Sequence, residues 1–346
     1  MKLIRGFKQV KILMVFLFLG ALFFFHSCKK EDSLYEDDSL RICSPHPIEF
    51  IKPLIENFEY ETGIKVQITQ EGTGEILDKI TKTAPIPYCD ILWGGSLSIV
   101  LPFSHFFEHY QSSNEAYIEM QYRNVEGNLT RFTDVPSILM INRKVCGNVK
   151  IEGYKDLLQE ELKGKIALCY PERSSSATEH LINILYAMGN GNCSESWEFV
   201  RQLCKNLDGI ILSSSSQVYQ GVAEGKFAVG LTFEDAGAKY ARADENIELV
   251  YMEEGVLFTP DGIYVVKNTS NREKAFAFVD YMTSQKVQMY IVDLLHRRSV
   301  RSDIETPPSF VSKKNMKVIP VQYSFVSEHK QDWITRFNTI LEEELR

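Results

Sequence analysis

Along the first part of the chain, the spacing of hydrophobic residues switches between the period of a β-strand and that of an α-helix. Short apolar or alternating stretches over 40–43, 64–69 and 89–93 are typical of β-strands. Between them, apolar residues recur every three or four positions over 48–60 and 75–82, the spacing of amphipathic helices. Gly63 follows the first of these helices and is expected to end it in a left-handed conformation. The pattern predicts strands and helices that follow one another in turn.

The same alternation continues further along the chain. The predicted strands cover 137–141, 165–170, 227–233 and 247–252. The predicted helices cover 154–162, 177–188, 196–207, 217–224 and 271–284. Strand, small polar loop and helix in turn indicate an α/β protein with a mostly parallel sheet flanked by helices.

Two stretches look like crossings between two such lobes. Residues 131–141 run as one long extended segment, and 255–267 repeat this appearance later in the chain. We therefore predict a first lobe from 40–136 and 262–346 and a second lobe from 137–261, with a ligand cleft between them.

The first residues have the layout of an export signal. Four basic residues precede an apolar run over 12–25, and His26, Ser27 and Cys28 follow. A membrane-spanning anchor is the alternative. Fourteen residues rise only about 21 Å as a helix, whereas a hydrocarbon core is roughly 30 Å thick, which favours a signal peptide. We expect 1–27 to be a lipoprotein signal peptide, with 28–39 a charged tether. The segment 25–28 resembles a bacterial lipobox, which would place a lipid on Cys28 and anchor an exported protein at the cell membrane.

The net charge and the cysteine spacing argue against several classes of function. Loss of 1–27 would change the formal net charge from −8 to −12, which argues against a nucleic-acid partner. Six cysteines remain after Cys28 without the Cys/His spacing of a zinc site, and a bridge between Cys193 and Cys204 stays open. With no nucleophile and base at a recognisable spacing, we expect a monomeric binding protein, not an enzyme.

Small polar residues follow the predicted strands and make up most of the candidate binding site. In the first lobe they are Ser44 and His46 after one strand, Gly72 and Thr73 after the next, and Gly95 after the third. Because loops at strand ends converge on one edge of such a sheet, these residues are expected to line one side of the cleft.

The second lobe repeats this theme. Ser174 and Ser175 precede the helix predicted over 177–188, and Ser214 precedes the helix over 217–224. A helix start offers free N–H groups and a partial positive charge that suit phosphate or carboxylate. The spacing Ser176-x-x-Glu179 is that of a capping box, which is an alternative, purely structural use of these residues.

Glu234 and Asp235 follow the strand predicted over 227–233. Several carboxylates would repel a dianion, so they suit the hydroxyl or ammonium end of a solute whose other end is anionic. Solvated surface charge is the alternative reading.

The stretch GKFAVGLTFED over 225–235 resembles a segment of ABC-importer extracellular solute-binding proteins, in the branch that binds ferric iron, hexose phosphates or phosphoglycerate. EYETGIKV, DILWGG, RSSSAT, EEGVLFTPDGIYVVK and RRSVRSD extend the resemblance over almost all of the chain after 40. It implies the type II periplasmic-binding fold and delivery of a solute to a membrane permease with an ATPase. The hexose-phosphate members imply ligand contacts from Ser44, Gly72, Thr73, Gly95, Ser174, Ser175, Ser214, Glu234 and Asp235.

The resemblance leaves the solute open. A small anionic, phosphorylated organic solute is favoured over ferric iron, since the iron binders use two adjacent tyrosines and this sequence has no Tyr-Tyr. Iron would enter only as cargo, with Glu75, Glu234 and Asp235 as its oxygen ligands, and no resident cofactor is expected. A third possibility is a ligand-sensing partner of a sensor histidine kinase.

Overall fold

The structure is a computed structural model that describes residues 38–306 and 309–345. The strands are β1 (Leu40–Ser44), β2 (Val66–Gln70), β3 (Ile91–Ser96), β4 (Thr130–Asn142), β5 (Ile166–Ala167), β6 (Val229–Phe233), β7 (Ile247–Val250), β8 (Phe258–Val265) and β9 (Arg298–Ser299). The α-helices are α2 (Ile48–Thr62), α3 (Thr73–Thr83), α4 (Leu97–Val100), α5 (Arg143–Cys146), α6 (Ser175–Gly189), α7 (Ser194–Asn206), α8 (Ser215–Ala223), α9 (Glu234–Ala241), α10 (Arg272–Thr283), α11 (Gln285–Leu294) and α12 (Tyr323–Glu344).

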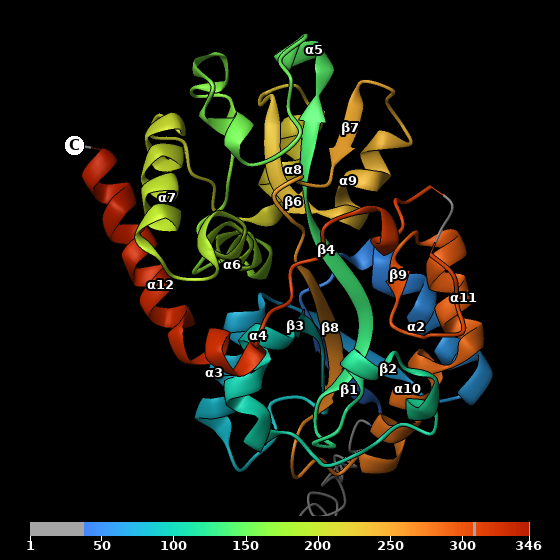
Figure 1. Cartoon of the computed structure of the whole chain (residues 1–346). Coiled ribbons are helices and arrows are strands. Elements are labelled where there is room, and N and C mark those ends of the chain that lie inside the picture. Colours follow the sequence, from blue (N-terminus) through green and yellow to red (C-terminus); the bar gives the residue numbers. More distant parts are fainter. Residues whose placement is uncertain (1–37, 307–308, 346) are drawn as a thin grey trace, which may run out of the picture. The chain divides into compact units, whose positions relative to one another are not determined.

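One long strand connects two groups of strands. The first half of β4 pairs antiparallel with β8 and β9, and its second half pairs antiparallel with β6 and β7. The other strands continue outward on either side, in the order β2-β1-β3-β8-β4-β6-β5. Figure 1 shows β4 running from one half of residues 39–346 to the other. We call the part built on β1–β3, β8 and β9 the first lobe and the part built on β5–β7 the second lobe.

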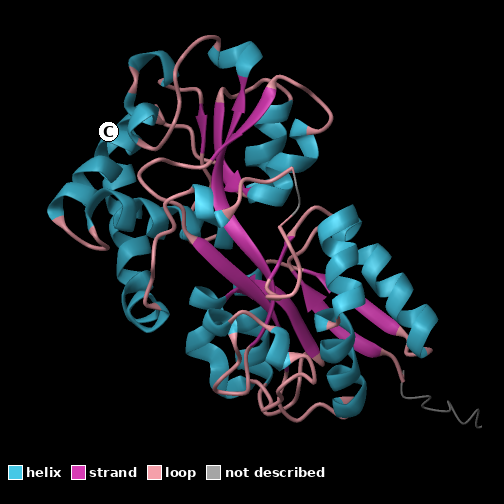
Figure 2. Cartoon of the chain, turned by 45° about the vertical axis from the view of Figure 1, so that its right-hand side comes forward, coloured by secondary structure: helices cyan, strands magenta, loops and turns pink. Residues whose placement is uncertain are grey.

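The sheet is mixed, whereas the alternation of strands and helices predicted a mostly parallel one. β1 runs parallel to β2 and β3, and β5 runs parallel to β6. The difference comes from β4 and β8, which pass between the lobes and so run antiparallel to most of their neighbours. Figure 2 shows helices covering the strands in both lobes, so the predicted α/β fold of two lobes joined by crossover strands is confirmed.

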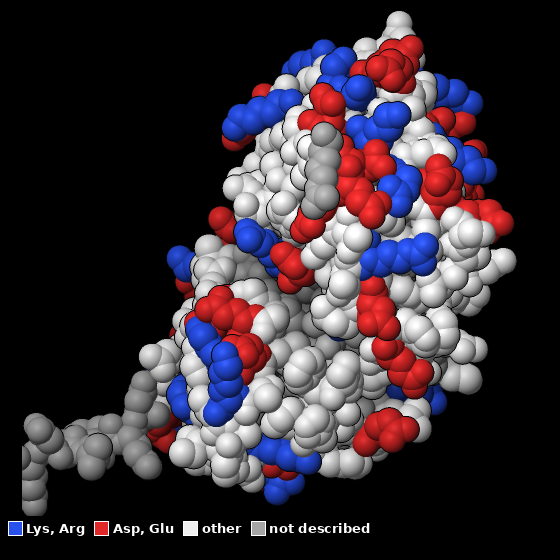
Figure 3. Space-filling model, turned by 90° about the vertical axis from the view of Figure 1, so that its left-hand side faces the viewer, with Lys and Arg blue, Asp and Glu red and all other residues white. Residues whose placement is uncertain are grey.

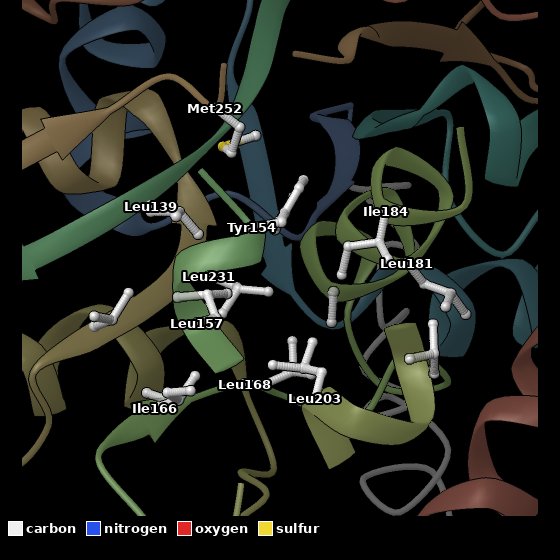
Figure 4. Packing of buried hydrophobic residues seen from close by; sticks show 14 of the residues in the cluster. Leu139, Tyr154, Leu157, Ile166, Leu168, Leu181, Ile184, Leu203, Leu231 and Met252 are labelled. Atoms are coloured by element: carbon white, nitrogen blue, oxygen red, sulfur yellow. The ribbon is translucent and has the colours of Figure 1, made fainter. Parts of the chain in front are cut away.

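Each lobe has its own hydrophobic core. The core of the second lobe brings together Leu139 of β4, Leu231 of β6, Leu181 of α6 and Leu203 of α7, all nearly inaccessible to solvent (Figure 4). The first lobe buries Trp93 with other aromatic and aliphatic residues of β1, β3, α2 and α10. Removal of this apolar surface from water is the main force that holds each lobe together.

Helix α2 shows how the sequence pattern becomes structure. Ile51, Leu54 and Phe58 are buried at helical spacing, and Gly63 ends the helix with φ 74°, as predicted. The N–H of Gly63 donates to the carbonyl of Glu59 at 2.9 Å, which satisfies one of the last helical carbonyls.

The helix predicted over 154–162 is instead two 3₁₀ turns, Lys155–Leu158 and Glu160–Leu162. The side-chain amide of Asn206 donates to the carbonyls of Leu157 and Gln159, at 2.5 and 3.1 Å. Asn206 thus connects this segment to α7.

Helix α12 buries its apolar face in the core of the second lobe. Trp333, Phe337 and Leu341 are each about 2% exposed and belong to that core. The sequence predicts that all of 262–346 belongs to the first lobe, whereas these α12 residues lie in the core of the second lobe. Cys193 and Cys204, for which a bridge had stayed open, are both free thiols.

The predicted signal peptide, the lipidation site Cys28 and the tether up to residue 37 lie outside the described residues. Within 38–306 and 309–345, none of the helices combines the length and apolar character needed to cross a membrane.

Candidate ligand-binding site

A pocket of about 500 Å³ lies where loops of the two lobes meet, which is within the usual size of small-molecule sites. From the first lobe it is lined by the loop after β1, the start of α3 and the end of β3. From the second lobe it is lined by the loops that precede α6 and α8. Residues of β4 and β8 form its floor.

Four helices begin at this pocket: α2, α3, α6 and α8. Gly72 precedes α3 and has no side chain with which to cap it, so the pocket faces uncapped first-turn N–H groups there. Each helix start contributes partial positive charge, and four of them directed at one volume favour an anionic ligand.

The serines of the second lobe cap their helices. Ser174 Oγ accepts a hydrogen bond from the N–H of Ala177 at 3.4 Å, and Ser214 Oγ accepts one from the N–H of Gln217 at 3.3 Å. Ser175 Oγ donates to Thr73 Oγ1 at 3.2 Å and thus connects the two lobes across the pocket. The predicted capping box at Ser176 and Glu179 is wrong, because Ser174 occupies the cap position.

Glu179 instead reaches across the pocket floor. Its Oε1 accepts hydrogen bonds from Ser96 Oγ at 2.7 Å and from Ser98 Oγ, and its Oε2 accepts one from Thr259 Oγ1 at 2.7 Å. Three hydroxyl donors from β3, α4 and β8 therefore satisfy a buried carboxylate on α6.

Arg297 is a buried cation in the pocket lining. Its Nη2 donates to Asp235 Oδ2 at 2.7 Å and its Nη1 to Asp261 Oδ2 at 3.1 Å, and its guanidinium lies 4.2 Å from the centre of the Phe50 ring. Burial alone would lower the pKa of Arg297, but the charges of Asp235 and Asp261 raise it. Arg297 is charged, and its charge is balanced within the wall of the pocket.

His46 lies beside this group. Its Nε2 is 3.1 Å from Asp261 Oδ2, without the geometry of a hydrogen bond. Burial lowers the pKa of His46, and the nearby Asp261 only partly offsets this, so the ring is neutral at pH 7. Asp261 has its own pKa lowered: burial opposes this, but contacts with His46, Arg297 and Thr133 outweigh it.

The structure brings most of the predicted site residues together. Those that line the pocket are His46, Gly72, Thr73, Gly95, Ser174, Ser175 and Ser214. They come from segments far apart in the chain, which supports the idea that small polar loops at strand ends form one site.

Ser44, Glu234 and Asp235 do not line the pocket, and their direct contact with a ligand stays a prediction. Ser44 is completely buried, and its Oγ donates to the carbonyl of Trp93 at 2.6 Å. Glu234 and Asp235 are engaged by Arg298 and Arg297. Sequence reasoning could not foresee these partners because they lie more than sixty positions away along the chain.

The three carboxylates suggested for iron are not gathered at one place. Glu75 is largely exposed and lies 3.0 Å from Lys79 Nζ, while Glu234 and Asp235 pair with arginines. Over the two described ranges, no group of three His, Cys, Asp or Glu residues is arranged to hold a metal ion. Tyr219 lines the pocket with its ring centre 5.9 Å from that of Tyr240, and burial raises the pKa of Tyr219 to about 12.

Sequence reasoning missed Arg297, Asp261 and Glu179. Arg297 belongs to the RRSVRSD stretch and Asp261 to TPDG, so both lay within motifs already noted for the resemblance. The role of these side chains in the site follows only from the contacts described above.

Known proteins are similar to the chain over most of its length. A curated relative, "Probable ABC transporter periplasmic-binding protein y4fP" of Sinorhizobium fredii, is 20% identical over 79% of this chain and 78% of its own length. Iron uptake protein A1 of Synechocystis is 22% identical over 75% of each chain.

Two solved structures show the same fold. A protein described as "Two-component system protein mediate signal transduction" has 28% identity and a TM-score of 0.72, covering 85% of this chain and 100% of its own. AfuA from Actinobacillus pleuropneumoniae, with exogenous fructose-6-phosphate bound, has 20% identity and a TM-score of 0.78, covering 88% of this chain and 98% of its own.

A family model described as bacterial extracellular solute-binding protein matches residues 104–324, well over half of the chain. This confirms the family that the motifs indicated. The chain therefore belongs to the bacterial extracellular solute-binding proteins.

Proposed function

We propose that this protein is the solute-binding receptor of an ABC import system and that its solute is a small phosphorylated organic anion. The observation that carries the proposal is the convergence of four helix starts, two of them preceded by serine clusters, on one pocket between the lobes. The y4fP relative supports the ABC assignment, and the AfuA structure supports a phosphate ester as the solute.

The pocket also has features suited to the organic part of such a solute. Glu179 and Asp261 supply carboxylates, and Tyr219 and Phe233 supply apolar surface. A second phosphate would meet these carboxylates, so a solute with one anionic end and a hydroxylated remainder fits best. On the face shown in Figure 3, acidic and basic side chains are interspersed, which gives no support to binding of a large polyanion.

Thermal unfolding with a panel of compounds tests the proposal. Glucose 6-phosphate, fructose 6-phosphate, 3-phosphoglycerate and aminoethylphosphonate are compared with glucose and inorganic phosphate. We expect at least one phosphate ester to raise Tm with increasing concentration, by more than its unphosphorylated counterpart. No shift across the whole panel would overturn the phosphorylated solute.

Ferric iron is a less favoured cargo because the three suggested carboxylates are dispersed. Metal analysis after loading from ferric citrate tests this alternative, and stoichiometric retained iron would reverse the preference.

A second candidate function is ligand sensing for a histidine kinase. It is favoured by the two-component signal-transduction protein, which is 28% identical and is covered completely by this chain. Deletion of the gene distinguishes the two roles: loss of solute uptake supports import, whereas intact uptake with loss of solute-induced transcription supports sensing.

We also propose that the protein is exported and anchored through a lipid on Cys28. Mass spectrometry of the mature N-terminus is expected to detect the lipid on Cys28. A mature N-terminus that begins at Cys28 without a lipid would contradict the anchor.

A further inference from the structure

We infer that two adjacent arginines, Arg297 and Arg298, and two adjacent acids, Glu234 and Asp235, form a clamp between the lobes that sets the width of the solute pocket. This inference rests on the proposed solute-binding function of that pocket. It adds a positioning role for Glu234 and Asp235, which the sequence predicts to contact the solute.

The two ion pairs are close and well directed. Nε and Nη2 of Arg298 donate to the two carboxylate oxygens of Glu234, each at 2.7 Å, in a bidentate arrangement. Arg297 Nη2 donates to Asp235 Oδ2, also at 2.7 Å. Consecutive residues of one segment thus hold consecutive residues of another.

The two segments belong to different lobes. The arginines follow α11, and Arg298 lies in β9, opposite Asp134 in the first half of β4. The acids begin α9, directly after β6, which pairs with the second half of β4. The clamp therefore bridges the point at which β4 passes from one lobe to the other.

The arginines are fixed on the first-lobe side by further contacts. Arg297 also donates to Asp261 of β8 and lies over Phe50 of α2. Arg298 Nη2 donates to the carbonyl of Val311 at 2.6 Å, and its guanidinium lies 5.5 Å from the centre of the Phe258 ring and 5.3 Å from that of Phe310. Each guanidinium is thus held in place independently of the acid that it binds.

Burial makes both pairs sensitive to the loss of either partner. Side-chain exposure is 4% for Arg297, 15% for Asp235 and 2% for both Arg298 and Glu234. At this degree of burial, solvent screening is weak, and removal of one partner leaves a charge uncompensated.

The two pairs face different surroundings. Arg297 lines the solute pocket, whereas Arg298 and Glu234 do not. With the clamp formed, the lobes are at the spacing at which Ser175 of α6 reaches Thr73 of α3. The clamp thereby preorganises the pocket, which improves affinity by lowering the cost of ordering on binding.

Asp235→Asn tests the clamp because it removes one charge at nearly constant volume and replaces no residue that lines the pocket. We expect the radius of gyration of the ligand-free variant, from small-angle X-ray scattering, to exceed that of the wild type. We also expect the Kd for glucose 6-phosphate to rise about tenfold or more. The scattering result needs no ligand, so absence of glucose 6-phosphate binding by the wild type would count against the proposed solute and leave the clamp to be judged by scattering.

Glu248→Gln is the matched control. It breaks the ion pair of Arg143 with Glu248, which is also 2.7 Å long but lies within the second lobe. We expect it to change neither the radius of gyration nor the Kd. If Asp235→Asn does not fold, as judged by circular dichroism, Arg297→Lys keeps the charge but loses the forked geometry. It is then measured by scattering alone, because Arg297 itself lines the pocket. The inference would be overturned if the folded clamp variant had the same radius of gyration as the wild type. An equal increase of the radius of gyration in Glu248→Gln would also overturn it.

Discussion

Single residues in this protein owe their properties to partners distant in sequence. His180 of α6 is completely buried in the core of the second lobe. Its Nε2 lies 2.7 Å from the carbonyl of Thr232, which can only accept, so Nε2 carries the proton and Nδ1 accepts from the Tyr154 hydroxyl at 2.9 Å. Burial lowers the pKa of His180 from 6.5 to about 4.

This neutral histidine predicts a loss of stability in mild acid. The unfolded chain takes up a proton on His180 below about pH 6.5, whereas the folded protein does so only near pH 4, so the unfolded state binds more protons between these values. The free energy of unfolding is therefore unaffected by this group above pH 6.5 and falls as the pH is lowered. The loss reaches about 3 kcal/mol near pH 4 and below.

Urea unfolding from pH 7 to pH 4 measures this effect. His180→Gln is expected to be less stable at pH 7 and to show a shallower dependence on pH than the wild type. Parallel pH curves for the two proteins would contradict the assignment.

At the scale of elements, the start of α6 shows the limit of local sequence rules. Ser174 and Ser176 both precede or begin the helix, and the S-x-x-E spacing favours Ser176 as the cap. In the structure Ser174 is the cap, and Glu179 accepts hydrogen bonds from hydroxyls of β3, α4 and β8. A tertiary contact thus displaces the local motif.

The two serines form a matched pair for a test. Ser174→Ala is expected to lower the free energy of unfolding by about 1 kcal/mol through loss of the cap. Ser176→Ala removes no cap and is expected to stay within about 0.5 kcal/mol of the wild type. Urea unfolding of both variants without ligand measures the difference, and a larger cost for Ser176→Ala would restore the capping box.

At the scale of the whole molecule, α12 shows that sequence continuity does not determine which lobe a helix joins. Its sequence follows first-lobe segments, but its apolar face is buried in the core of the second lobe. The helix also contacts α4 in the first lobe and α7 in the second. It can therefore restrict the relative motion of the lobes.

Replacing a buried and a partly exposed phenylalanine of α12 tests whether the helix is held by the core of the second lobe. Phe337→Ala removes a side chain that is 2% exposed and is expected to cost about 3–5 kcal/mol. Phe325→Ala removes one that is 38% exposed and is expected to cost much less. The midpoints of thermal unfolding give the order, and equal shifts would show that α12 is not anchored through this core.

The sequence by itself determined the family, the α/β class and the two-lobed plan, and most of the site residues that it predicted line the pocket. It could do so because periodicity, helix-ending glycines and polar loops at strand ends are local properties, and local patterns are preserved when the chain folds. The serine and glycine loops were predictable for this reason.

Only the tertiary structure decided what the charged side chains do. Glu234 and Asp235 follow a strand end just as a ligand-binding pair would, but Arg297 and Arg298 approach them through the fold and take up their charges. Because a buried charge must be paired, its role depends on which oppositely charged group the fold brings near, and this is not encoded at any fixed spacing along the chain.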